Sequence, residues 1–224
     1  KIAELRDDAK KPQPITTGIR IEIDQNNNVD RYVFVGTGKL LGPDDIADAS
    51  VTNTLYVIRD GTRTAADAAP TPPYTRADLK TVSGVTADGF SGPAIGRGRG
   101  WYQDATDKQQ MINTDVYADV QTVVFAFSKA QSDPCLGDLT STLYARDFTT
   151  GSSVLEPSAG GAVLPSIDIG GISGIRLIQS STGDVRLQVT TTSVTPTGGP
   201  SGPGQVFSFG IKLSVFPFIV LMAL

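Results

Sequence analysis

A short polar segment between two hydrophobic stretches carries the side chains best suited to bind a metal ion. Oxygen-bearing side chains occupy every second position of this segment, namely Glu22, Asp24, Asn26, Asn28 and Asp30. Calcium-binding loops surround their ion with such alternating oxygen ligands, and three carboxylates supply the charge that a hard cation requires. The pattern therefore predicts a calcium site, with calcium as the cofactor.

This segment departs from a complete EF-hand loop at two positions. The sixth position, where glycine is usual, is Asn27, a residue type that tolerates left-handed backbone geometry. The twelfth position is Val33 in place of the bidentate glutamate. The alternative is an asparagine-rich hairpin turn whose side chains bind only their own backbone.

Other candidate sites carry weaker signals. Gly36–Gly42 is glycine-rich but lacks the lysine and hydroxyl pair of a phosphate loop and the long helix after it. Trp101 and Tyr102 would suit a glycan-stacking platform, although a buried core position is the expectation for such an aromatic pair. The adjacent acids Asp7–Asp8 and Asp44–Asp45 are interpreted as solvated turns, because glycosidases need two carboxyl groups that face each other.

The composition excludes several classes of chemistry. The chain of 224 residues contains no histidine and one cysteine, Cys135, which removes Ser-His-Asp and Cys-His catalysis and any disulfide within the chain. A net charge of −4 and a pI of about 4.8 argue against a nucleic-acid partner. We therefore expect a protein that is not an enzyme.

The elements that would position these side chains are short strands. The chain has 24 glycines and 14 prolines, and its apolar residues alternate with polar ones, which favours strands joined by turns. Expected strands cover Gly18–Asp24 and Arg31–Val35 as a hairpin, then Thr54–Arg59, Gln121–Ser128, Thr140–Phe148, Gly174–Gln179 and Asp184–Thr190. The fold class is all-β, with long loops between the strands.

The end of the chain has a different composition. Residues 1–194 form the expected strand domain, residues 195–204 are a proline- and glycine-rich linker, and residues 205–224 are an apolar strand or flexible docking tail. The strongly apolar segment Leu213–Leu224 has twelve residues, includes Pro217 and is too short for a membrane helix, so no transmembrane segment is expected. The side chains expected to bind a partner by strand addition are Val215, Phe216, Phe218, Ile219, Val220 and Leu221. Alternatively, residues 206–224 close the chain's own sheet.

Several segments in order resemble one protein family. They are Gln13–Thr17, Tyr32–Leu41, Leu55–Ile58, Gly100–Tyr102, and Ser132–Cys135 followed by Leu143–Gly151. Together, over roughly residues 12–155, they are similar to the C-terminal β-propeller of the PilY-type, or PilC-type, adhesins of the type IV pilus tip. A whole propeller of that family has more blades than this chain can form. The resemblance therefore implies a partial β-propeller, the C-terminal blades of a larger one.

The resemblance also implies a function. It predicts a non-enzymatic pilus-tip adhesin and assembly factor that contacts minor pilins, a host-cell or abiotic surface, and the remainder of the parent propeller. The expected location is extracellular, at the pilus tip or cell surface, reached through the periplasm. Family propellers carry calcium loops, which favours a calcium-modulated function. The alternatives are a propeller enzyme, either a glycosidase or a quinone-dependent dehydrogenase, and a structural filament subunit.

Overall fold

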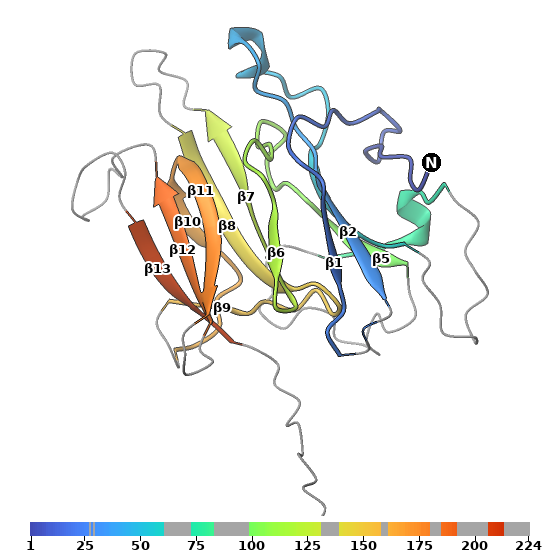
Figure 1. Ribbon diagram of the computed structural model, residues 1–224. Helices are drawn as coiled ribbons and strands as arrows, with labels where there is room; N and C mark the ends of the chain where they lie inside the picture. The colour runs from blue at the N-terminus through green and yellow to red at the C-terminus, as the bar shows by residue number, and fades with distance from the viewer. Residues whose placement is uncertain are drawn as a thin grey trace, which may run out of the picture.

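Three sheets make up the described part of the chain (Figure 1). The structure is a computed structural model, and it describes residues 1–26, 28, 30–60, 73–82, 99–130, 139–157, 161–179, 185–191 and 206–212. In these residues all the regular structure is β-strand apart from two single 3-10 turns, Pro43–Asp45 and Arg76–Asp78. The predicted all-β class is confirmed.

The strands follow the chain order within each sheet with few exceptions. The first sheet has the order β1-β2-β3-β5-β4, from β1 (Arg20–Ile23), β2 (Arg31–Gly36), β3 (Thr54–Arg59), β4 (Lys80–Thr81) and β5 (Gly100–Asp104). The second has the order β10-β8-β7-β6, from β6 (Tyr117–Asp119), β7 (Thr122–Ala130), β8 (Leu139–Asp147) and β10 (Ile167–Gly170). The third has the order β11-β12-β13-β9, from β9 (Leu155–Glu156), β11 (Ile172–Gln179), β12 (Val185–Thr191) and β13 (Val206–Ile211).

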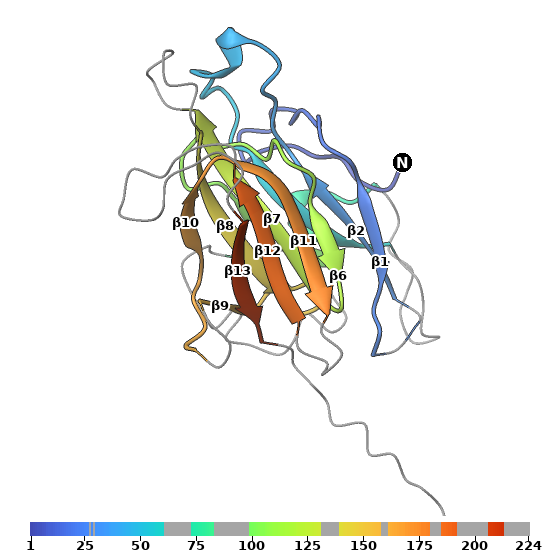
Figure 2. The ribbon, with the colours of Figure 1, turned by 60° about the vertical axis from the view of Figure 1, so that its left-hand side comes forward.

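The three sheets stand face to face in the manner of neighbouring propeller blades (Figures 1 and 2). Strands β1 and β11 both contact β6, so the three inner strands lie in one row along an edge of the stack. Each blade then continues outward from this row, and the stack is open at both ends. This arrangement is the predicted partial β-propeller.

The hydrophobic pattern of the second sheet explains the stacking. Strand β7 is apolar at successive positions, and successive side chains of a strand point to opposite faces. Val123, Phe125 and Phe127 pack against the first sheet, while Val124 and Ala126 pack in the cluster shared with the third sheet. A strand covered on both faces requires this continuous apolar run.

Trp101 joins the first two sheets. Its side chain is fully buried in the cluster between them, and its indole Nε1 donates a hydrogen bond of 2.8 Å to the carbonyl of Phe148. The expected core position of Trp101 is therefore confirmed. Tyr102, next to it, is half-buried on the opposite face of β5, where Arg76 stacks on its ring at 4.1 Å.

The C-terminal segment enters the third sheet in the part that is described. Strand β13 pairs with β12 along its length and with β9 at its end, so these residues belong to the chain's own sheet. The predicted linker, the proposed partner-binding side chains Val215, Phe216, Phe218, Ile219, Val220 and Leu221, and Cys135 all lie outside the described residues.

Gly100 is the glycine on which the pairing of β3 with β5 depends. It has a φ of +114°, and a Cβ atom built there would lie 1.9 Å from the carbonyl oxygen of Val57. We expect Gly100→Ala to lower the free energy of unfolding by more than about 3 kcal/mol, because both the backbone angle and the space exclude a methyl group. Urea denaturation measures this loss.

Gly42→Ala is the matched control. No atom lies within 4 Å of the corresponding Cβ position, and the residue is extended. The same substitution there should change the free energy of unfolding by less than about 0.5 kcal/mol. Equal effects of the two substitutions would contradict the assigned role of Gly100.

Candidate functional site

The predicted calcium segment forms the connection between β1 and β2. The two strands pair antiparallel from Arg20 opposite Phe34 to Ile23 opposite Arg31, which confirms the predicted hairpin. The amide of Asp24 donates to the carbonyl of Asp30 at 2.8 Å and closes the base of the loop. Inside the loop, Asn28 has a φ of 53° and its amide donates to the carbonyl of Asp24 at 2.7 Å.

Two of the five predicted ligands lie together at the base of this loop. The side chains of Asp24 and Asp30 are both buried. The Asp24 carboxylate accepts hydrogen bonds from the amide of Asn26, at 2.9 Å, and from the side chain of Gln121. The Asp30 carboxylate forms an ion pair with Arg59, at 2.7 Å between Oδ1 and Nη2. Both carboxylates are therefore held in place by specific donors.

The other three predicted ligands differ in their surroundings. Glu22 forms an ion pair of 2.6 Å with Arg20 on β1, and the side-chain amide of Asn26 donates to Gln121 at 2.9 Å. Asn28 is exposed. Within the described ranges, no group of three or more Asp, Glu, His or Cys side chains is arranged to hold a metal ion. The calcium site stays a prediction.

The electrostatics of this region are set by burial. Tyr32 lies on β2 opposite Glu22, and desolvation raises the pKa of its phenol far above the usual value. Arg59 partly offsets this rise in pKa, and the carboxylates of Asp24 and Asp30 add to it. The phenol therefore stays neutral, and Arg59 is a buried positive charge paired with the carboxylate of Asp30.

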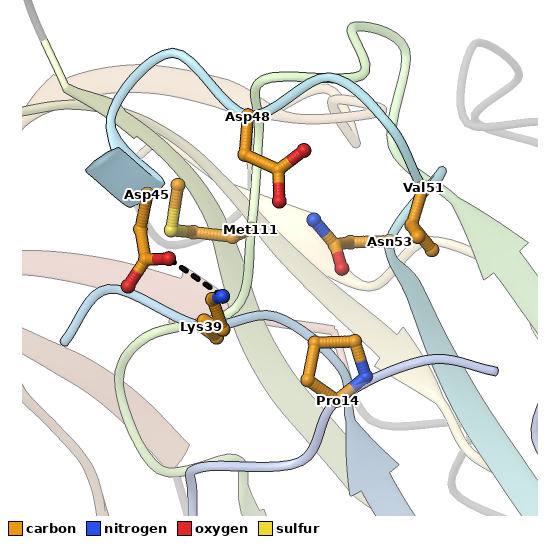
Figure 3. A pocket seen from close by; sticks show the side chains of 7 residues that line it. All are labelled: Pro14, Lys39, Asp45, Asp48, Val51, Asn53 and Met111. Carbon is orange, nitrogen blue, oxygen red and sulfur yellow. Dashed lines mark ion pairs between the residues drawn. The ribbon is translucent and has the colours of Figure 1, made fainter. Parts of the chain in front are cut away.

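A pocket of about 210 Å³ lies at the other end of the first sheet (Figure 3). The residues that line it come from the N-terminal segment, the connection between β2 and β3, and the segment after β5: Pro14, Lys39, Asp45, Asp48, Val51, Asn53 and Met111. In Figure 3 the carboxylate of Asp48 and the amide of Asn53 point into the space between them, with the Lys39–Asp45 pair below. The pocket offers charged groups of both signs.

Asp45 is the best-fixed charge of this pocket. Its Oδ1 lies 2.8 Å from Lys39 Nζ, and its Oδ2 accepts hydrogen bonds from the amides of Leu41 and Gly42 at 2.8 and 3.1 Å. The Lys39 hydrogen bond, followed by that of the Leu41 amide, lowers the pKa of Asp45. Hydrogen bonds from Ser50 lower the pKa of Asp48.

These lowered pKa values limit the chemistry of the pocket. Both carboxylates are ionised at neutral pH, and the same ion pair raises the pKa of Lys39 and keeps its amine protonated. A general acid or base works best with a pKa near the working pH. The pocket is therefore suited to hold a polar or cationic group by hydrogen bonds and charge.

The sequence patterns did not reveal this pocket. The sequence predicts a short helical turn at Pro43–Asp48, which the structure has at Pro43–Asp45, but no pattern predicts that Lys39 pairs with Asp45 while Asp44 stays exposed. Proline followed by two acids at Pro43 is the local signal for the turn that fixes Asp45. Asn53 and Met111 come from distant segments and have no local signal.

Strand β1 exposes an apolar row on one face. Ile21 and Ile23 alternate along it and Ile19 directly precedes it; Ile19, Ile21 and Ile23 are 59%, 59% and 48% exposed. Ile21 lies opposite Val33, which lies opposite Ile58, so the row continues the buried apolar face of β2 and β3. Ala3, Leu5 and Tyr74 cover that face further along the sheet. We refer to Ile19, Ile21 and Ile23 as the isoleucine row.

Blade-like sheets stacked around one row of inner strands define the class of this protein as a partial β-propeller. No known family model matches the chain, and no curated protein matches it. The crystal structure of the Pseudomonas aeruginosa PilY1 C-terminal domain does match, with a TM-score of 0.64 and 20% sequence identity over 96% of this chain. The match covers 48% of that chain, so this chain spans about half the length of the PilY1 domain. The predicted resemblance is confirmed at the level of the fold, which is PilY1-like.

No helix in the described ranges is both long and apolar enough to span a membrane.

The Lys39–Asp45 pair should make stability depend on pH. The folded-state pKa of Asp45 lies below its unfolded value, so the contribution is complete above about pH 4 and is lost as the pH falls through the lower folded-state pKa. We expect Asp45→Asn to lower the urea midpoint at pH 7 and to flatten the loss of stability as the pH falls below about 4. Urea titrations across this pH range measure both effects.

Asp44→Asn is the control, because Asp44 is exposed beside the same turn. It should leave the shape of the acid profile unchanged. An acid profile of Asp45→Asn that coincides with that of the unsubstituted protein would contradict the role of this pair.

Proposed function

We propose that the chain is a non-enzymatic binding and assembly module of a type IV pilus, built as part of a larger β-propeller. The observation that carries this proposal is the PilY1-like fold over 96% of the chain. The segments that resemble the pilus-tip adhesins, including Tyr32–Leu41 and Gly100–Tyr102, support it from the sequence. Its expected location is extracellular, at the pilus tip or cell surface, after passage through the periplasm.

The open ends of the stack supply the surfaces that such a module needs. The isoleucine row lies on β1, which is the edge strand of the first sheet and the inner strand of its blade. Burying three half-exposed isoleucine side chains is favourable by about 1 kcal/mol or more for each. We assign the row to contact with the remainder of the parent propeller, and the other exposed surfaces to minor pilins and to host-cell or abiotic surfaces.

Calcium is the second part of the proposal. Asp24 and Asp30 are fixed at the base of the β1–β2 loop, and Asn26 and Asn28 lie between them with polar side chains. A calcium ion prefers such oxygen ligands. Asp30 faces Arg59, so binding of the ion through Asp30 has to compete with an existing ion pair.

The pilus role is tested with the longer protein of which this chain is proposed to be a part. We expect it to retain minor pilins in a pull-down, and its deletion to reduce piliation and surface attachment. Replacing the isoleucine row with threonines keeps β-branched side chains in the strand but removes apolar surface. This variant should weaken association between this chain and the separately expressed remainder of its parent protein by about tenfold or more.

Leu41→Thr is the matched control for the isoleucine row, since Leu41 is an exposed apolar residue in the connection between β2 and β3, outside the strands of the stack. It should leave that association unchanged. If minor pilins are not retained and deletion leaves piliation and attachment intact, the pilus role is wrong. If the threonine variant associates as tightly as the parent, the assignment of the isoleucine row is wrong.

Calcium binding is tested by thermal denaturation. Calcium should raise the melting temperature of the parent protein relative to a chelator, because an ion that binds only the folded state stabilises it. Asp24→Ala combined with Asp30→Ala should remove this shift, whereas Asp44→Asn, outside the loop, should retain it. If the melting temperature of the unsubstituted protein is the same with calcium and with chelator, the protein has no such site.

A further inference from the structure

Arg146 is a buried cation between the first and second sheets. It lies on β8 opposite Val123 of β7, and its side chain is fully buried. Its Nε donates to Oε1 of Gln103 on β5 at 2.7 Å, and its Nη1 donates to the carbonyl of Gly151 at 3.0 Å. Among the described residues, nothing accepts a hydrogen bond from its third nitrogen, Nη2.

Gln103 carries a second unmatched donor at the same place. Its side chain is also fully buried, and its Nε2 finds no acceptor in the described part of the chain. Nε and Nη2 share one edge of a guanidinium, and Oε1 and Nε2 share one amide group. The Nε–Oε1 hydrogen bond therefore joins the two groups that carry the unmatched donors, Nη2 of Arg146 and Nε2 of Gln103, in direct contact.

No carboxylate balances the charge of Arg146. The ion pairs between described residues do not include it. Tyr144 lies under the guanidinium at 5.6 Å, but burial raises the pKa of its phenol, which stays neutral. Burial lowers the pKa of Arg146 to about 10, so at neutral pH the side chain remains a buried positive charge.

A buried charge of this kind is costly unless a counter-charge accompanies it. A water molecule would satisfy the two donors but would leave the charge unbalanced. A monoatomic anion accepts both hydrogen bonds and neutralises the guanidinium. A larger oxyanion has more acceptor oxygens than the two adjacent donors can satisfy.

We propose that Arg146 Nη2 and Gln103 Nε2 bind a chloride-like halide ion in the interior between the first two sheets. The ion takes the place that a carboxylate occupies in an ordinary buried arginine pair. It thereby connects β5 of the first sheet with β8 of the second, close to the Trp101–Phe148 hydrogen bond. The site is independent of the pilus role and of the calcium loop.

Chloride dependence of the melting temperature tests the site. With the full chain at constant ionic strength, replacing gluconate by chloride from about 5 to about 300 mM should raise the melting temperature by a few degrees. Gln103→Glu supplies a carboxylate that accepts from both Nε and Nη2. It should raise the melting temperature in gluconate and remove the chloride dependence.

The exposed pair Arg176–Gln188 is the matched control. There Nε and Nη2 of Arg176 both donate to Oε1 of Gln188, at 3.0 and 2.7 Å, on the surface of the third sheet. Gln188→Glu should leave the chloride dependence unchanged. Crystals of the parent protein grown with bromide should show an anomalous peak beside Arg146, a readout that does not need a variant to fold.

Two results would overturn the site. A melting temperature that is the same in chloride and gluconate at equal ionic strength would show that water or nothing fills the space. A chloride effect of equal size in Gln103→Glu would show that chloride acts elsewhere on the protein.

Discussion

The second sheet is covered on both faces, and this burial is the constraint on which the rest of the structure depends. Strand β7 has apolar side chains on its two faces, and each face needs a neighbouring sheet to exclude water. The first and third sheets meet this need. The Trp101–Phe148 hydrogen bond joins the first sheet to the end of β8 in the second. The outer faces of the first and third sheets, which point away from the second sheet, also need cover where they are apolar. The N-terminal segment covers part of the outer face of the first sheet but leaves the isoleucine row exposed.

Buried polar groups connect the layers that apolar packing alone would leave free to slide. Arg76 stacks on Tyr102 and forms ion pairs with Asp104 of β5 and with Asp8 of the N-terminal segment. Tyr56 of β3 donates to the side chain of Gln13 at 2.6 Å. These contacts attach the N-terminal segment to the first sheet through specific geometry. Arg146 differs from Arg76 because its protein partners, an amide and a carbonyl, are both neutral.

The sequence predicted those elements whose signals are local. The hairpin of β1 and β2 and the long strands β7 and β8 follow from alternation and from apolar runs that a window of a few residues contains. Strands β4 and β9 have only two residues each, too few to show such a pattern, and only pairing with partners distant in sequence defines them. The pocket was missed for the same reason, since Lys39, Asn53 and Met111 meet only after the sheet has formed. The sequence groups the five alternating oxygen side chains as one set, but in the structure Glu22 pairs with Arg20 on the same strand, and Asp24 and Asp30 lie at the loop base.

Strand β1 brings two of the proposed functional features into one element. The isoleucine row ends at Ile23, and the adjacent Asp24 begins the loop in which the calcium site is proposed. The backbone hydrogen bond between Asp24 and Asp30 closes that loop directly beside the last pair of the hairpin, Ile23 with Arg31. A ligand that draws Asp24 and Asp30 together would therefore also fix the end of β1 and the direction of its exposed side chains. If the isoleucine row contacts the remainder of the propeller, occupancy of the loop and closure of the propeller share one strand, and each stabilises the other through it.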